Sequence, residues 1–302
     1  MQKVLVTGSN GLLGQKLIRL LQTPLYANQF DYLGISRGEN RLPRLTKNYH
    51  PVDLTNLQAV KAAIEVYQPH IIIHTAAMTQ VDDCEMNREA CWQQNVKAVE
   101  YLLQAAQPYQ SHFIHLSTDF IFDGKTGMYD EQATPNPISY YGESKLAAEK
   151  IVNHSPLPWA IVRTVLVYGV AEAMSRTNIV LWVKQSLEAG KAIKVVNDQW
   201  RTPTLAEDLA QGCMLIASQK AKGIFNISGQ ELLTPYDIAL ATAHFFQLDA
   251  SLIEKVDGSL FKQPAQRPPK TGFNIEKAVQ LLGYRPHSFQ EGLGVLKTQL
   301  VS

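Results

Sequence analysis

Tyr141 and Lys145 lie four residues apart within Ser139–Asn153, a stretch that we expect to form a helix. Residues four apart share one face of a helix, so the phenol and the ammonium would be neighbours. An isolated tyrosine has a pKa of about 10, whereas a nearby ammonium stabilises the phenolate and lowers that pKa. Such a pair could act as a general acid–base near neutral pH. As a bare pattern it occurs by chance in many surface helices, so its weight depends on the rest of the chain.

A second motif is the glycine-rich turn GSNGLLG at residues 8–14, directly after the expected strand Lys3–Val6. Gly8 would permit the tight turn, Gly11 would let the backbone approach a pyrophosphate, and Gly14 would let the following helix pack closely on the strand. The start of that helix offers free N–H groups to phosphates. The alternative is a turn without a ligand, but its position between strand and helix favours dinucleotide binding. The cofactor contacts that we expect here are Gly8, Asn10, Gly11, Leu12 and Gly14.

The ends of the later strands would select and enclose the same cofactor. The expected strand Tyr32–Ser36 ends without the acidic residue that binds a ribose 2′-hydroxyl, and Ser36 and Arg37 could instead hold a 2′-phosphate. The alternative is that Arg37 is a solvated surface residue. We therefore expect NADP(H) as the preferred cofactor and leave NAD(H) open. The remaining expected contacts are Asp53 and Leu54 after a short third strand, Thr75, Ala76 and Ala77 after the fourth, and Lys145 at the ribose.

Strand and helix candidates alternate from Lys3 to Val167, which would bring these motifs to one edge of a sheet. The run Ile71–Ile73 is apolar at consecutive positions, as in a strand buried on both faces. We therefore expect an α/β fold with a doubly wound parallel sheet of the Rossmann type. Its later elements are expected as helices at Asn56–Tyr67, Arg88–Ala106 and Ser139–Asn153, and as strands at His70–Thr75, His112–Ser117 and Trp159–Val167.

After Gly169 the alternation becomes less regular, and from about residue 230 the pattern indicates a smaller C-terminal, α-rich substrate lobe. We expect residues 1–230 to form an NAD(P)-binding domain and residues 231–302 the substrate lobe, with 170–190 open to either assignment. The elements expected in this part are helices at Asn178–Ala189, Leu205–Ala217, Pro235–Phe246 and Ile275–Leu282, and strands at Ala192–Val196 and Gly223–Ser228.

The composition fits a globular enzyme and argues against several other classes of protein. Of 302 residues, 45% are hydrophobic and 18% charged, which permits a large core and argues against disorder. A net charge of +1 gives no electrostatic basis for binding nucleic acid or a membrane surface. Cys84, Cys91 and Cys213 lack CxxC spacing, which argues against a metal site and a disulfide framework. No apolar run approaches the roughly 20 residues of a membrane span, so we expect a cytoplasmic protein.

Several stretches give the chain a resemblance to a known family. They are Thr7–Gly14, His74–Glu85, Leu116–Gly124 and Tyr140–Lys145, with weaker matches at Arg163-Thr164, Asp198-Gln199, Thr202–Thr204 and Arg267-Pro268. With these residues the chain resembles an extended short-chain dehydrogenase/reductase and, within that superfamily, the dTDP-4-dehydrorhamnose reductase family. The Ser-Thr-Asp-aromatic-x-Phe-Asp-Gly block is the most specific part of the match.

The resemblance implies a reaction and roles for individual residues. NAD(P)H would deliver hydride to C4 of a nucleotide-linked 4-keto-6-deoxy sugar, as in dTDP-L-rhamnose biosynthesis. Tyr141 would protonate the developing alkoxide, and Lys145 would tune Tyr141 and hold the cofactor ribose. Thr118 and Asp119 would position the sugar. Asn95 matches an asparagine common in the superfamily, although an exposed helical asparagine is an equally good interpretation.

Two departures from the family pattern affect the choice of substrate. Leu166 stands where the family usually has a tryptophan that contacts the sugar, and Arg201 replaces a common glycine before Thr202–Thr204. An arginine in a substrate lobe could bind a diphosphate through two parallel hydrogen bonds, so we expect Arg201 to bind substrate. A surface location is the alternative. Both departures concern which sugar nucleotide is bound rather than the reduction itself.

Two other functions remain alternatives to a reductase. One is a sugar-nucleotide epimerase or dehydratase on the same scaffold, which would need a further acid–base pair that the sequence does not identify. The other is an NADP-binding regulatory subunit of the methionine adenosyltransferase type, which binds the dinucleotide without reducing a sugar. A hydrolase is disfavoured because Ser117 has no nucleophile-elbow glycines around it. A homodimer is left open.

Overall fold

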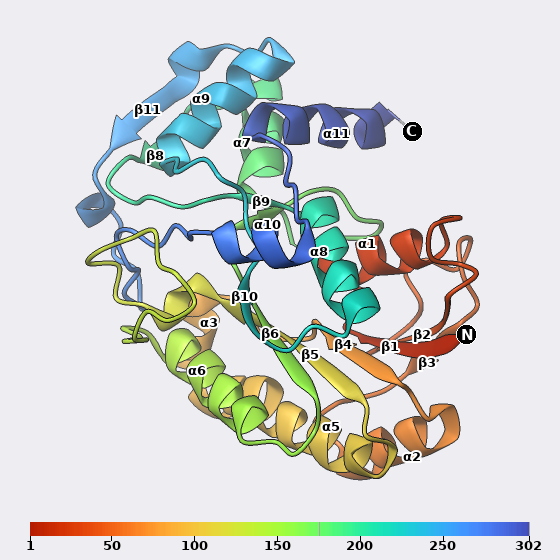
Figure 1. Cartoon of the computed structure of the whole chain (residues 1–302). Helices are drawn as coiled ribbons and strands as arrows, with labels where there is room; N and C mark the ends of the chain where they lie inside the picture. Colours follow the sequence, from red (N-terminus) through yellow and green to blue (C-terminus); the bar gives the residue numbers. More distant parts are fainter. Residues whose placement is uncertain (175, 302) are drawn as a thin grey trace.

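The computed structural model of the protein describes residues 1–174 and 176–301. At its centre lies a seven-stranded parallel sheet in the order β10-β6-β5-β4-β1-β2-β3, which confirms the doubly wound sheet predicted from the sequence (Figure 1). Its strands are β1 (Gln2–Thr7), β2 (Phe30–Ser36), β3 (Tyr49–Pro51), β4 (Ile71–His74), β5 (His112–Thr118), β6 (Trp159–Thr164) and β10 (Gly223–Asn226).

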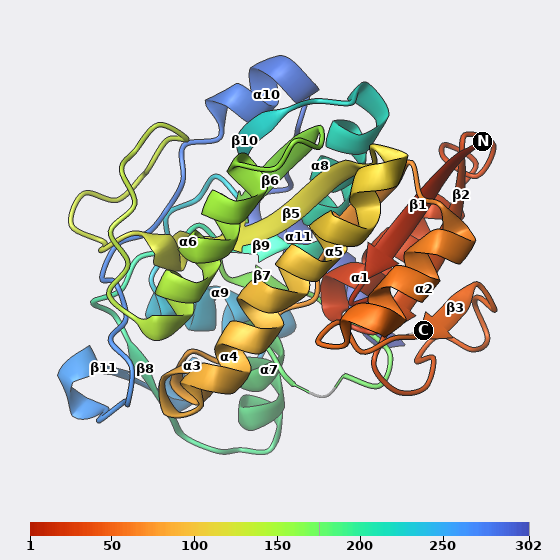
Figure 2. The same cartoon turned by 90° about the horizontal axis from the view of Figure 1, so that it is seen from below.

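Helices cover both faces of this sheet, and Figure 2 shows α2, α5 and α6 lying across one of them. In β4, Ile71 and Ile73 belong to one hydrophobic cluster and Ile72 to the other. Successive side chains of a strand point to opposite faces, so a strand between two helical layers must be apolar throughout. One layer contains α1 (Leu12–Leu21), α8 (Ala206–Gln219) and α10 (Glu276–Leu282), and the other contains α2 (Leu57–Tyr67), α5 (Ala98–Ala106) and α6 (Tyr140–Asn153).

The long helix predicted at Arg88–Ala106 is broken by a π-helical turn. The segment begins as α4 (Arg88–Trp92), passes through the π-helical turn η1 (Gln93–Lys97), and continues as α5, while a separate short helix α3 (Val81–Met86) precedes it. A π turn inserts one extra residue into the helix and frequently marks a functional site. Hydrophobic spacing does not reveal it, so the sequence predicted an uninterrupted helix.

A second group of elements lies beyond the strand ends of the sheet, at the top of Figure 1. Its helices α7 (Ile179–Glu188) and α9 (Pro235–Phe246) pack together, and β8 (Ile193–Val196) pairs in parallel with β11 (Ile253–Val256). The division at residue 230 stays a prediction. The packed pair α7 and α9 spans it, because α7 precedes residue 230 in the sequence and α9 follows it. The remaining elements are α11 (Phe289–Val301), β7 (Val167–Tyr168), β9 (Thr204–Leu205), and the short 3₁₀ helices η2 (Gln107–Tyr109), η3 (Asp119–Ile121), η4 (Ala250–Leu252) and η5 (Gly258–Leu260).

The strand predicted at Trp159–Val167 ends earlier than expected. β6 stops at Thr164, and β7 resumes at Val167 in a different, two-stranded sheet with β9. Between them Leu166 adopts φ = 38°, a left-handed conformation that an L-residue seldom takes and that redirects the chain. In this conformation Leu166 lies at the wall of the largest cavity described below.

Candidate active site

The glycine-rich turn has the close packing that its spacing predicted. Gly8 has φ = 67°, and a Cβ on it would lie 2.8 Å from the backbone nitrogen of Ala76. A Cβ on Gly14 would lie 2.3 Å from the carbonyl oxygen of Gly8. Any side chain at either position would therefore collide with backbone. The turn closes through a hydrogen bond from Gly11 N to Gly8 O (2.8 Å), and it leads into the start of α1, whose N-cap residue Gly11 supplies no capping side chain.

Asn10 shapes the cofactor site through a neighbouring loop. Its Nδ2 donates to the carbonyl oxygens of Glu39 (2.8 Å) and Arg37 (3.3 Å), and its Oδ1 accepts from the backbone N–H of Arg41 (3.0 Å). These bonds hold the segment after β2 against the glycine-rich turn. Asn10 thus positions the two arginines, a role that its place in the motif did not reveal.

The predicted cofactor residues surround a cavity of about 300 Å³, which we call the cofactor cavity. Thr55 donates to Asp53 from its backbone (2.9 Å) and its hydroxyl (2.7 Å), and the backbone bond is the main reason why the pKa of Asp53 is lowered. The guanidinium of Arg37 donates to Gln94 Oε1 (3.2 Å) at the wall of the cavity. The predicted residues that line it are Gly8, Asn10, Gly11, Ser36, Arg37, Asp53, Leu54, Thr75, Ala76 and Ala77.

A second cavity, of about 760 Å³, continues from the first and contains the predicted catalytic residues. We call it the reaction cavity. Asn10, Gly11, Arg37 and Thr75 line both cavities, so one elongated ligand could occupy the two together. The other predicted residues on its wall are Leu12, Ala77, Thr118, Asp119, Tyr141, Lys145 and Arg201, whereas Gly14 lines neither cavity and its contact with a cofactor stays a prediction.

Tyr141 is placed by the close approach of α6 to the end of β5. The hydroxyl of Ser139 caps α6 by accepting from Gly142 N (3.3 Å). Gly142 is required there, because a Cβ would lie 2.1 Å from the carbonyl oxygen of Phe120. This contact, which the sequence did not predict, brings the Tyr141 ring edge-on to Phe120 at 5.8 Å and its hydroxyl to Thr118.

The electrostatics of the Tyr141–Lys145 pair differ from the expectation. Burial raises the pKa of Tyr141 above its ordinary value, and the hydrogen bond with Thr118 opposes that rise. Burial also lowers the pKa of Lys145 to about 8. Lys145 Nζ donates to the carbonyl oxygen of Leu116 at 2.6 Å. The spacing predicted a lowered Tyr141 pKa, whereas the net shift is upward because burial dominates.

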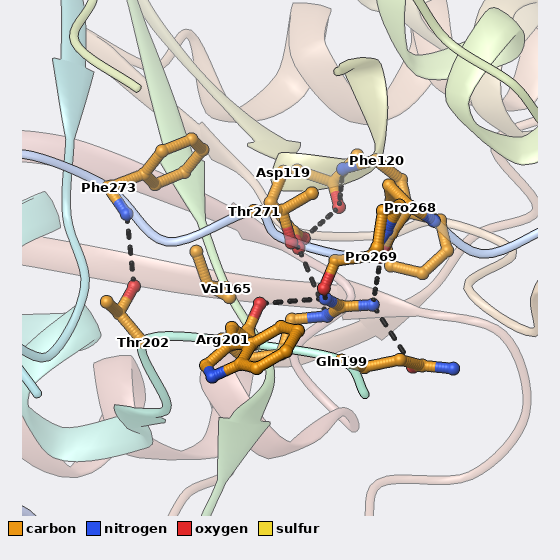
Figure 3. Close-up of polar contacts among 12 residues, drawn as sticks. Asp119, Phe120, Val165, Gln199, Arg201, Thr202, Pro268, Pro269, Thr271 and Phe273 are labelled. Carbon is orange, nitrogen blue, oxygen red and sulfur yellow. Dashed lines mark hydrogen bonds and ion pairs between the residues drawn. The ribbon is translucent and has the colours of Figure 1, made fainter. Parts of the chain in front are cut away.

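Arg201 is neither a surface residue nor an open clamp for a diphosphate. The residue is 4% exposed, and its guanidinium donates to the carbonyl oxygens of Trp200 (2.8 Å), Pro268 (2.8 Å) and Pro269 (3.3 Å) (Figure 3). Its Nε lies 3.8 Å from Asp119 Oδ2. Arg201 thus ties the segment after β8 to residues 268–269 and to the end of β5. Its expected contact with substrate stays a prediction.

Asp119 is enclosed by donors that come from three parts of the chain. It accepts hydrogen bonds from Thr118 Oγ1 (3.0 Å) and from Thr271 Oγ1, and Arg201 faces its other side (Figure 3). Burial raises the pKa of Asp119, and Arg201 and Thr271 oppose that rise. Sequence reasoning missed Thr271, because no motif marks it and only the fold brings it to Asp119.

Asn95 proves to be buried rather than exposed. From the π-helical turn its Oδ1 accepts from Met78 N (2.7 Å), and its Nδ2 donates to Met78 O (3.0 Å) and Ser144 Oγ (3.0 Å). It therefore joins the segment after β4 to α6, one turn from Tyr141. Cys91 lies in the same cluster, with its Sγ 3.4 Å from both Asn95 Nδ2 and Ser144 Oγ.

A third cavity of about 450 Å³ lies at the outer end of the reaction cavity, and we call it the outer cavity. Thr177 and Asn178 line both. Its walls come from α7, β8 and residues 258–267, which carry Trp182, Lys194 and Phe261. The sequence singled out none of these, since isolated aromatic and basic residues carry no spacing signal.

Among the described residues, 1–174 and 176–301, no helix is long and apolar enough to cross a membrane.

A glycine-rich dinucleotide cradle and a Thr–Tyr–Lys set at the end of a parallel sheet define an extended short-chain dehydrogenase/reductase. Comparison with known proteins agrees: a family model described as the RmlD substrate binding domain matches residues 1–301. The chain therefore belongs to the RmlD substrate-binding domain family. The predictions of the superfamily, of the family and of an NAD(P)H-dependent oxidoreductase are confirmed.

Individual relatives span nearly the whole chain. The chain is 31% identical over 294 residues to the probable low-salt glycan biosynthesis reductase Agl14 of Haloferax volcanii. The matched residues cover 97% of this chain and 96% of that protein. The chain is 32% identical over 288 residues to methionine adenosyltransferase 2 subunit beta of Danio rerio, with 93% and 85% covered. The structure of a dTDP-4-dehydrorhamnose reductase from Bacillus anthracis in complex with NADP has a TM-score of 0.86 and 27% identity, with 99% and 100% covered. NADP is the cofactor bound in that structure, and a homodimer of this chain stays a prediction.

Proposed function

We propose that the protein reduces a nucleotide-linked 4-keto-6-deoxy sugar with NADPH, most specifically as a dTDP-4-dehydrorhamnose reductase in dTDP-L-rhamnose biosynthesis. The observation that carries this proposal is the continuity of the two inner cavities. A dinucleotide cradle in which a Cβ on Gly8 would collide with backbone opens directly into the cavity that holds Thr118 and Tyr141. A carbonyl placed beside these hydroxyls would also lie beside the nicotinamide end of the cradle.

The residues of the reaction cavity divide the chemistry between them. Bound NADPH supplies the hydride to the substrate carbonyl. Tyr141 donates its hydroxyl proton to the carbonyl oxygen as negative charge develops there, and Thr118 orients that hydroxyl. The raised pKa of Tyr141 keeps the proton in place until the alkoxide forms. Lys145 provides an ammonium that holds the ribose and stabilises the phenolate left behind.

The preference for NADPH is supported by the charges around the cofactor cavity. Arg37 and Arg41 both line it, and no acidic residue stands at the end of β2. Guanidinium groups bind phosphate more strongly than they bind a ribose hydroxyl. Arg37→Gln is therefore expected to weaken NADPH binding by about tenfold or more while leaving NADH nearly unchanged, as measured by nicotinamide fluorescence. An equal loss for both dinucleotides would count against the preference.

The outer cavity supports a nucleotide at the far end of the substrate. Trp182 and Phe261 offer aromatic faces for a base, and Lys194 offers a positive charge for a diphosphate. Arg267 also lines this cavity, but both of its terminal nitrogens donate hydrogen bonds to the Asp82 carboxylate, at 3.0 and 2.7 Å.

We propose that α7 and β8 serve the substrate lobe together with residues 231–302. We further propose the cytoplasm as the site of action, since a reducing compartment suits Cys84, Cys91 and Cys213, all of which are free thiols.

A regulatory role is the second candidate, because the chain is 32% identical to methionine adenosyltransferase 2 subunit beta. The two functions predict different results when NADPH oxidation is followed at the absorbance of the reduced nicotinamide. A reductase oxidises NADPH on addition of a dTDP-linked 4-keto-6-deoxy sugar. A protein that binds NADPH tightly but shows no turnover with that substrate would refute the reductase and leave the regulatory role.

A further inference from the structure

Lys145 is held from the side of β5 by a carbonyl and an imidazole. Its Nζ donates to the carbonyl oxygen of Leu116 at 2.6 Å and lies 3.5 Å from His115 Nε2. Both side chains are buried, since 3% of Lys145 and none of His115 is exposed. The reaction described above assigns a role to Lys145 and none to His115, although the two side chains are in contact.

The surroundings of His115 define which of its nitrogens carries the proton. Burial holds the pKa of His115 well below its ordinary value, and the charge of Lys145 lowers it further, so the ring is neutral. A neutral imidazole has one donor nitrogen and one acceptor nitrogen. The nitrogen that faces an ammonium must be the acceptor, which is Nε2, and Nδ1 therefore carries the hydrogen. Nδ1 meets no hydrogen-bond partner among the described residues, so Nε2 is the only ring nitrogen with a polar role there.

The ring of His115 is fixed by a row of residues across three strands. It stacks on His74 at 5.5 Å and lies nearly parallel to Phe113 at 6.5 Å. His74 is fixed in turn by a 2.7 Å hydrogen bond between its Nδ1 and Thr7 Oγ1. Thr7, His74 and His115 are neighbours in the register of β1, β4 and β5. This row begins at the residue before Gly8 and ends at Lys145, so it connects the cofactor cradle to the ammonium.

We infer that His115 is a positioning residue that, together with the carbonyl oxygen of Leu116, holds the ammonium of Lys145 in place for cofactor binding and proton transfer. An ammonium has three N–H donors. Leu116 and His115 take two of them and leave one for a group in the reaction cavity, whose wall includes Lys145. The inference rests on the proposed function only in its statement of what the held ammonium is used for.

The test replaces the acceptor and measures the ammonium directly. His115→Phe keeps a flat ring for the stack with His74 and removes the acceptor, so the charged form of Lys145 loses a partner. The Nζ signal of ¹⁵N-lysine-labelled, cofactor-free protein is titrated by NMR and assigned by its loss in Lys145→Met. We expect the midpoint to fall by about one pH unit in His115→Phe, because a hydrogen bond to a charged group favours the charged form. In His115→Phe the affinity for NADPH above neutral pH should also fall, because less of Lys145 carries its charge there.

A rescue variant and a control separate this role from a loss of packing. His115→Gln can place an acceptor near the former Nε2 and should recover at least half of the shift. His112→Phe replaces another buried histidine of β5, one without a hydrogen bond to Lys145, and should leave the midpoint unchanged. If His115→Phe does not fold, His115→Leu takes its place. The other groups that act on the Lys145 charge, Glu149, Cys84 and Cys91, are the same in every variant.

An unchanged Lys145 midpoint in folded His115→Phe or His115→Leu would overturn the inference. A shift that His115→Gln fails to recover would overturn it as well, since the acceptor would then not be the cause. These titrations use neither sugar nucleotide nor dinucleotide. A failure of the reductase assay therefore leaves their outcome intact, and an unchanged midpoint leaves the reductase proposal intact.

Discussion

Tyr141→Phe is the substitution that tests the proposed chemistry most directly. It removes one hydroxyl and keeps the ring that packs edge-on against Phe120 at 5.8 Å. Thr118 retains its 3.0 Å hydrogen bond to Asp119, so the substitution leaves Thr118 with a partner. The free energy of unfolding should therefore change by only about 1 kcal/mol or less, the net value of one hydrogen bond.

The effect on turnover should be far larger than the effect on stability. General acid–base catalysis by a positioned side chain contributes roughly 10²- to 10⁴-fold, which corresponds to about 3–5.5 kcal/mol of barrier. We expect kcat to fall by that factor while the Kd for NADPH stays within about twofold, since the hydroxyl serves proton transfer rather than dinucleotide binding. The assay follows NADPH oxidation with the dTDP-linked keto sugar, and fluorescence titration gives the Kd.

Tyr140→Phe is the matched control, because Tyr140 is the neighbouring tyrosine and has no lysine four residues on. Its ring lies under the Arg88 guanidinium at 4.9 Å and beside Trp92, and Tyr140 is not among the residues that line the reaction cavity. This variant should keep close to full activity. If Tyr141→Phe retains more than about a tenth of the wild-type kcat, the loss is smaller than general acid–base catalysis contributes, and the proposed role of Tyr141 is refuted.

Four further predictions follow from the packing and charges of the site. Gly14→Ala places a Cβ 2.3 Å from Gly8 O, so it should destabilise the fold by about 1–3 kcal/mol in denaturant unfolding and should weaken NADPH binding. The control Gly294→Ala, whose Cβ would have nothing within 4 Å, should be neutral or stabilising. Equal effects of the two substitutions would contradict the close packing of the glycine-rich turn. Lys145, with its pKa lowered to about 8, should lose its charge above that pH, so kcat/KM should fall above about pH 8, and a profile that stays flat to pH 10 would be incompatible with the role of the ammonium. The same depressed pKa means that the unfolded chain binds more protons between about pH 8 and 10.4, so the unfolding free energy of wild type relative to Lys145→Met should rise with pH over that window. Arg201→Lys should cost about 1–3 kcal/mol of stability because it breaks the fork of bonds to residues 268 and 269, and a raised KM without loss of stability would instead support the substrate clamp expected from the sequence.

The sheet could be predicted because its signals are local and periodic. Apolar residues at consecutive positions, as in Ile71–Ile73, are required of a strand packed on both faces, and glycines at the spacing of Gly8 and Gly14 are required of a βα turn that packs so closely. The final helix α11 was missed because Gly292 and Gly294 weaken the helical signal in its sequence. Glycine is required at position 292 by a residue distant in sequence, since a Cβ there would lie 2.0 Å from the hydroxyl of Tyr168.

The catalytic set could be assigned to one site, but its electrostatics could not. Helical spacing places Tyr141 and Lys145 on one face of α6, and the structure agrees. Spacing cannot show that both are buried, or that Lys145 reaches back to Leu116 and His115 on β5. Burial acts in opposite directions on the two groups, because it disfavours the charged form of each. The sign of the shift at Tyr141 is therefore a tertiary property that the motif alone does not contain.

The same distinction explains why the reaction is easier to infer than the substrate. The groups that we propose to act on a carbonyl lie on β5 and α6, elements that the periodic sequence pattern predicted. The outer cavity, where we propose that a nucleotide binds, is lined mainly by residues 177–199 and 258–267, and those segments are joined by a hydrogen bond from Gly258 N to Asp198 Oδ2 (2.9 Å) and by the neighbouring pairing of β8 with β11. Arg201 illustrates this, since its partners Pro268 and Pro269 lie far along the chain and give it a structural role that the sequence did not predict. We therefore expect contacts between distant segments to set the choice of sugar nucleotide, and substitutions at Trp182 or Lys194 should alter substrate KM while leaving NADPH binding intact.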